Sequence, residues 1–69
     1  MMNEQEIARL ARQIGINPAD AVNAHKAEQA ATAQGVPIYK WQRANPEAAT
    51  LLMRIYRQHE ITIQERADD

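Results

Sequence analysis

The side chains best suited to specific recognition lie between Gly35 and Asn45. This stretch interleaves bulky apolar, aromatic and basic residues, and it holds two of the three aromatic side chains of the chain, Tyr39 and Trp41. Aromatic residues and arginine are the types enriched at the centres of protein–protein interfaces. We therefore expect this stretch to bind a partner.

The spacing within this stretch divides structural from exposed residues. On a short helix over residues 37–43, Trp41 is expected in the core, together with Val36 before the helix and Ala44 at its end, while Gly35 builds the turn. Tyr39 is two residues from Trp41 and should face solvent. The candidate partner-binding residues are Ile38, Tyr39, Lys40, Gln42 and Arg43.

Residue types that commonly support catalysis are scarce. The chain has no cysteine, no serine and no glycine-rich phosphate loop, and its two histidines, His25 and His59, have no metal-ligand spacing. The paired carboxylates Glu4 and Glu6 stand at a helix start, where capping explains them. We expect no enzymatic activity and no metal or other cofactor.

The charge and hydropathy of the chain restrict its environment. Its formal net charge is −1, although residues 36–59 carry a local basic excess from Lys40, Arg43, Arg54 and Arg57 against Glu47. A DNA-binding domain of this size is usually clearly basic, so near neutrality weakens that reading. No apolar run approaches the ~20 residues that cross a bilayer. The polar, acidic N-terminus is not of the secretory type, and a cytoplasmic location without a membrane partner is expected.

Helix signals cover most of the chain and predict a single all-α domain over residues 1–69. Asn3 with Glu6 forms a capping box, Gly15 and Gly35 are placed to end helices, and Asn-Pro pairs at 17–18 and 45–46 are placed to start them. The predicted helices are residues 4–14, 18–34, 37–43 and 46–64, with a flexible tail at 66–69. Within residues 18–34 an alanine stripe (Ala24, Ala27, Ala31) is expected to pack and His25 to face solvent.

The last predicted helix suggests a homodimer. Its apolar residues span a wider arc than the roughly 100° stripe that a surface helix of a monomer requires, and a 69-residue chain has a small core of its own. One face would then pack within the chain and the other against a second copy, with His59 hydrogen-bonded at the contact. The expected interface residues are Leu52, Met53, Ile55, Tyr56, His59 and Ile63.

Residues 28–44 resemble the helix-turn-helix of Cro-like phage regulators. Ala31 is small where two helices would cross, Gly35 follows four residues later at the turn, and Trp41 would face inward. The resemblance implies DNA reading through Gln42 and Arg43, which can hydrogen-bond to base edges. Ile38 offers no such hydrogen bond, and the preceding helix is longer than the pattern expects.

The length and helical character of the whole chain, centred on Tyr39, also resemble small phage-encoded quorum-sensing anti-activators. These are helical dimers that bind a LuxR-type transcription activator and a pilus-assembly ATPase. The resemblance implies a protein of the host cytoplasm in which Tyr39 and its neighbours occupy the activator and keep it off DNA. DNA reading and a plain helix-pairing module remain the alternatives.

Overall fold

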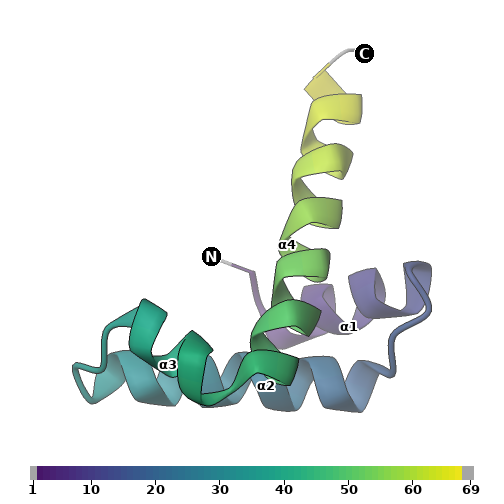
Figure 1. The fold of residues 1–69 in the computed structure, drawn as a ribbon. Coiled ribbons are helices and arrows are strands. Elements are labelled where there is room, and N and C mark those ends of the chain that lie inside the picture. The colour runs from purple at the N-terminus through teal and green to yellow at the C-terminus, as the bar shows by residue number, and fades with distance from the viewer. Residues whose placement is uncertain (1, 68–69) are drawn as a thin grey trace.

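The computed structural model describes residues 2–67, and the regular elements in this range are four α-helices (Figure 1). They are α1 (Glu4–Gln13), α2 (Pro18–Ala33), α3 (Ile38–Ala44) and α4 (Pro46–Ala67). The all-α class is confirmed. The expected end of the last helix at residue 64 was too early, because Glu65 and Arg66 are good helix formers and α4 continues through them. The predicted flexible tail is thus helical at residues 66–67, and its residues 68–69 lie outside the described range.

The start of α1 shows half of the predicted capping box. The Oδ1 atom of Asn3 accepts a hydrogen bond from the backbone N–H of Glu6 at 2.9 Å. The carboxylate of Glu6 lies instead beside Arg9 and His59, at 3.5 and 3.6 Å. Glu6 therefore links α1 to α4 in addition to stabilising its own helix start.

The turn between α2 and α3 depends on a glycine, as predicted. Gly35 has a φ of +82°, in the left-handed region that favours glycine. The N–H of Val36 donates to the carbonyl of Ala31 at 3.0 Å, and the N–H of Gly35 donates to that of Thr32 at 3.0 Å. These two bonds form the Schellman motif that satisfies the last carbonyls of a helix. Gly15 ends α1 in the same way.

The two Asn-Pro pairs differ in the structure, although the sequence predicts the same role for both. Asn17 caps α2, since its Oδ1 accepts from the N–H of Ala19 at 2.9 Å. The side chain of Asn45 points the other way, and its Nδ2 donates to the carbonyl of Trp41 at 2.9 Å. Asn45 thus closes α3, while Pro46 opens α4.

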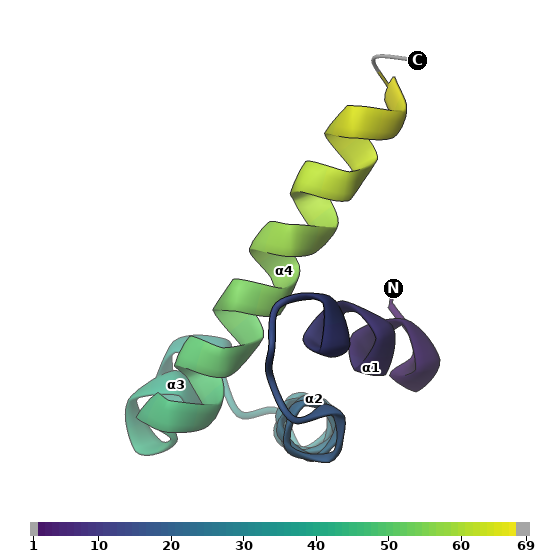
Figure 2. The same cartoon turned by 90° about the vertical axis from the view of Figure 1, so that its right-hand side faces the viewer.

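The helices enclose two adjoining apolar clusters. α1 and α2 pack side by side, α4 crosses both, and α3 fills the corner between α2 and α4 (Figures 1 and 2). Leu51 and Tyr56 of α4 pack against both clusters and join them. The first cluster contains Ile7, Leu10, Ala11, Ala21 and Ile55. The second contains Ala24, Trp41, Ala49 and Leu52.

This packing corrects the predicted dimer interface at two residues. Leu52 and Ile55 are only 1% and 0% exposed, and both lie in the core of the single chain. They face α1, α2 and α3 because α4 crosses the other helices along this side. Neither side chain has surface left for a second copy.

The buried face of α2 also differs from the prediction. His25 is buried rather than solvent-facing, and Ala27 is exposed. Alanines lie on several sides of α2, so apolar spacing alone does not identify the packed side. Val36 and Ala44, expected to point inward, are exposed, and Trp41 is the buried residue of α3.

The C-terminal half of α4 extends beyond the other helices in both views (Figures 1 and 2). Within residues 2–67, no helix is long and apolar enough to cross a membrane.

Candidate functional site

The first candidate site is the outer surface of α3, which we call the α3 tip and define as Ile38, Tyr39, Lys40, Gln42 and Arg43. Ile38 and Tyr39 stand in the first turn of α3 and are 51% and 56% exposed. Lys40 and Arg43 are exposed and Gln42 is half-buried. The structure thus gathers all five predicted partner-binding residues on one short helix.

Trp41 fixes the orientation of this surface. Its side chain is 7% exposed and belongs to the cluster with Ala24 of α2 and with Ala49 and Leu52 of α4. A buried tryptophan contributes a large apolar area and holds its helix in one rotation. With Trp41 inward, Tyr39 must point away from the core.

The α3 tip carries uncompensated positive charge. Among residues 2–67, neither Lys40 nor Arg43 forms an ion pair with an acidic group. The surface therefore combines an exposed apolar and aromatic pair with two basic groups. Such a surface can bury apolar area against a partner and pair with its carboxylates.

The structure separates the predicted dimer-interface residues into two groups. Leu52 and Ile55 lie in the core, as described above, while Met53 and Ile63 are 62% and 50% exposed. Tyr56 and His59 are half-buried and have partners within the chain.

One line of side chains nevertheless continues past the body of the molecule. Leu52, Tyr56, His59 and Ile63 follow one another at helical spacings of four, three and four residues, so they lie on one side of α4. The first is buried, the next two are half-buried, and Ile63 is exposed. The side of α4 that packs inside the chain therefore ends in an uncovered isoleucine.

The second candidate site is a polar cleft of about 450 Å³ between α1, α2 and α4. Met2 and Gln29 complete its wall, and among the described residues no lysine or arginine lines it. Its titratable lining residues are Glu6, His25, Glu28, Tyr56, His59 and Glu60.

Glu28 and Tyr56 form the inner part of this cleft. The carboxylate of Glu28 is buried, with the residue 6% exposed, and its Oε1 accepts a hydrogen bond from the Tyr56 hydroxyl at 2.8 Å. Burial, and then the hydrogen bond to Glu28, raise the pKa of the Tyr56 hydroxyl far above its usual range. Tyr56 therefore stays protonated and remains a donor.

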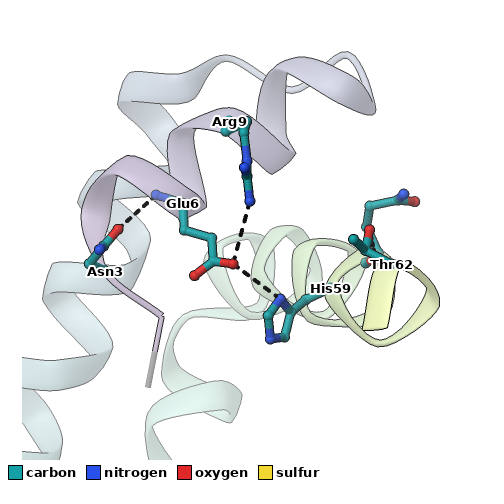
Figure 3. Close-up of polar contacts among 6 residues, drawn as sticks. Asn3, Glu6, Arg9, His59 and Thr62 are labelled. Atoms are coloured by element: carbon teal, nitrogen blue, oxygen red, sulfur yellow. Dashed lines mark hydrogen bonds and ion pairs between the residues drawn. The ribbon is translucent and has the colours of Figure 1, made fainter. Parts of the chain in front are cut away.

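Glu6 forms the outer part of the cleft, where α1 meets α4 (Figure 3). Its Oε1 atom lies 3.5 Å from Arg9 Nη2 and 3.6 Å from His59 Nδ1. These side chains are between 30% and 53% exposed, so their attraction is screened by solvent. His59, predicted to bond across a dimer, has a partner within its own chain.

The sequence predictions missed the cleft, although one pattern pointed to it. Ala21, Ala24, His25 and Glu28 are spaced as one face of a helix, and all four are buried. The two alanines on that face leave room for α4 to approach, and His25 and Glu28 then lie against it. If every residue on this face of the helix had been assigned to the interior, and not the apolar ones alone, His25 and Glu28 would have been predicted to be buried.

Among the described residues, no group of three potential ligands is close enough to hold a metal ion. No family model, curated protein or solved structure matches the chain. Functional reasoning therefore depends on the two surfaces themselves.

Proposed function

We propose that this chain is a non-enzymatic protein that binds and inhibits other proteins through the α3 tip. The observation that carries the proposal is the opposite placement of Tyr39 and Trp41, one half-exposed and the other anchored in the core. A fold that exposes an isoleucine and a tyrosine beside two free basic groups presents the residue types of an interface centre.

The partner proposed is a host transcription activator of the LuxR type, in keeping with the resemblance to phage-encoded anti-activators. The α3 tip would dock on the DNA-binding surface of the activator and compete with DNA. Lys40 and Arg43 would meet acidic groups of the partner, and a pilus-assembly ATPase is proposed as a second partner.

Tyr39→Ala tests this assignment in a calorimetric titration against the activator. We expect a loss of about 2 kcal/mol or more in binding, as for an interface hot spot, with an unchanged thermal unfolding curve. Asn23→Ala, a truncation of an exposed residue on α2, is the control and should bind normally. Equal binding by Tyr39→Ala and Asn23→Ala would remove the α3 tip from the function and favour a plain helix-pairing module.

We also propose that the chain acts as a homodimer through the projecting part of α4. The support is the line of residues that ends at Ile63, together with the exposed Met53. A second copy would cover apolar side chains that the single chain leaves in water, and a chain this small gains stability from such a contact.

Ile63→Glu tests the dimer without disturbing the core. We expect light scattering after size exclusion to give the mass of a dimer for the unchanged chain and of a monomer for the variant. Leu52→Glu is unsuitable, because it would place a charge at a buried position and unfold the chain. A monomeric mass for the unchanged chain at millimolar concentration would contradict the proposal.

The alternative function is DNA binding of the Cro-like kind. It is supported by the turn at Gly35 between α2 and α3 and by the exposed Arg43 on α3, which would be the second helix of the motif. It predicts binding to duplex DNA that weakens steeply with added salt. A gel-shift assay at low salt tests this alternative. If no shift is seen, DNA binding is excluded and protein binding remains the proposed function.

A further inference from the structure

Glu28 is a buried carboxylate with a neutral partner only. Its residue is 6% exposed, and within the part of the chain that the structure describes the one hydrogen bond to its side chain comes from the Tyr56 hydroxyl. Within residues 2–67, no lysine, arginine or histidine forms an ion pair with it. A buried carboxylate can accept several hydrogen bonds and is costly without a cation nearby. The carboxylate can therefore accept further hydrogen bonds from a cationic donor.

His25 supplies a second unsatisfied group on the same wall. It precedes Glu28 by one turn of α2, is 7% exposed, and lines the cleft. Its Nδ1 atom is buried and has no hydrogen-bond partner among the described residues. Buried polar atoms without partners are uncommon in folded proteins and indicate a missing donor or acceptor. A neutral imidazole can accept a hydrogen bond at this nitrogen after a small rotation of the ring.

The opposite wall adds negative charge and an aromatic ring. Glu60 of α4 lines the cleft and forms no ion pair among residues 2–67. Tyr56, an aromatic residue of the same helix, also lines the cleft. The cleft volume of about 450 Å³ is ample for the end of one long side chain. The site therefore offers, from two helices, two carboxylates without an ion pair among residues 2–67, a buried imidazole nitrogen and an aromatic residue.

We propose that this cleft binds a guanidinium group, such as the end of an arginine side chain presented by a partner. A guanidinium is planar, has five N–H donors, pairs with carboxylates through two parallel bonds and stacks on aromatic rings. An ammonium is a compact charge that makes no planar fork. The site uses no residue of the α3 tip, so it is independent of the partner binding proposed there, although it shares Tyr56 and His59 with the α4 line proposed for the dimer.

Three small probes test the proposal in nuclear magnetic resonance titrations of the full chain. They are the N-acetyl, C-methylamide derivatives of arginine, of lysine and of citrulline, the neutral analogue of arginine. We expect saturable shifts of the His25 and His59 ring signals with the arginine probe. Loss of the charge-assisted bonds should weaken the citrulline probe about tenfold or more, and the lysine probe should bind about threefold or more weakly.

Matched variants connect the binding to the cleft. Glu28→Gln keeps an oxygen for Tyr56 but removes the charge, and we expect the affinity for the arginine probe to fall about tenfold. Glu60→Gln also removes a carboxylate charge from the cleft, and we expect it to lower the affinity for the arginine probe as well. Glu60 is exposed, so this substitution does not endanger the fold. Glu47→Gln, an exposed glutamate of α4 outside the cleft, is the control and should change nothing.

Three results would overturn the proposal. The first is a linear response to the arginine probe without saturation. The second is equal affinity for the arginine probe and for the citrulline or lysine probe. The third is unchanged binding in both Glu28→Gln and Glu60→Gln, with thermal unfolding showing that the variants fold.

Discussion

The α3 tip and the polar cleft differ in how their side chains are held. Tyr39 projects from a helix whose position depends on Trp41, and its side chain has no hydrogen bond to the rest of the chain among residues 2–67. Tyr56 in the cleft is half-buried, joins both apolar clusters and donates to a buried carboxylate. The same residue type is thus free for a partner in one region and committed to the fold in the other.

This difference predicts where substitutions affect binding and where they affect stability. A side chain that contacts only solvent contributes little to the free energy of unfolding, whereas one that satisfies a buried group contributes much more. The three predictions below use matched substitutions at the two regions. Each result would either support or contradict the difference between the α3 tip and the polar cleft.

The largest effect is expected from truncating the anchor of α3. Trp41→Ala should lower the free energy of unfolding by about 3–5 kcal/mol, since a buried tryptophan loses its packing and leaves a cavity. Tyr39→Ala, two residues away, should change it by less than about 0.5 kcal/mol. Urea unfolding followed by circular dichroism measures both. A similar loss in the two variants would show that Tyr39 is part of the core and not a free contact.

A smaller effect is expected from removing one hydroxyl in each region. Tyr56→Phe leaves the carboxylate of Glu28 buried without its donor and should cost about 1–3 kcal/mol of stability. Tyr39→Phe removes the same hydroxyl from an exposed ring and should be neutral within about 0.5 kcal/mol. The same urea titration compares them. Neutral behaviour of Tyr56→Phe would mean that the Glu28–Tyr56 bond is replaced by water at no cost.

The smallest effect concerns alkaline pH. Folding raises the pKa of Tyr56, so its contribution to stability is fully present below the pKa of an unfolded tyrosine and is lost as pH rises toward the folded value. Above about pH 10, stability should therefore fall by up to about 1.4 kcal/mol per pH unit relative to Tyr56→Phe. Unfolding midpoints between pH 8 and 11 measure this. Parallel profiles for the unchanged chain and Tyr56→Phe would contradict it, and Tyr39→Phe should follow the unchanged chain.

Much of the fold could be predicted from local signals. Asn3, Asn17, Gly15 and Gly35 act within a few residues of their own positions, through caps and left-handed turns, and the structure confirms these roles. The exposure of Tyr39 and the burial of Trp41 follow from helical spacing alone.

The rest depends on contacts between distant parts of the chain. Whether Leu52 and Ile55 pack inside one chain or against another is decided by where α4 crosses α1 and α2, which no local pattern encodes. His25 is buried because alanines beside it let α4 approach. The burial of His25 and Glu28 was open to prediction from their helical spacing, but the residues of α1 and α4 that complete the cleft depend on how the three helices are arranged.

The shared packing of Leu51 and Tyr56 has a consequence for how the molecule opens. Because both side chains touch the two clusters, neither cluster can separate from α4 while the other stays intact. Amide hydrogens of α1 and α3 should therefore exchange with solvent through a common opening rather than helix by helix. A ligand bound at Glu28 would then slow amide exchange in both α1 and α3. Exchange in α3 would therefore respond to binding in a cleft that α3 does not line.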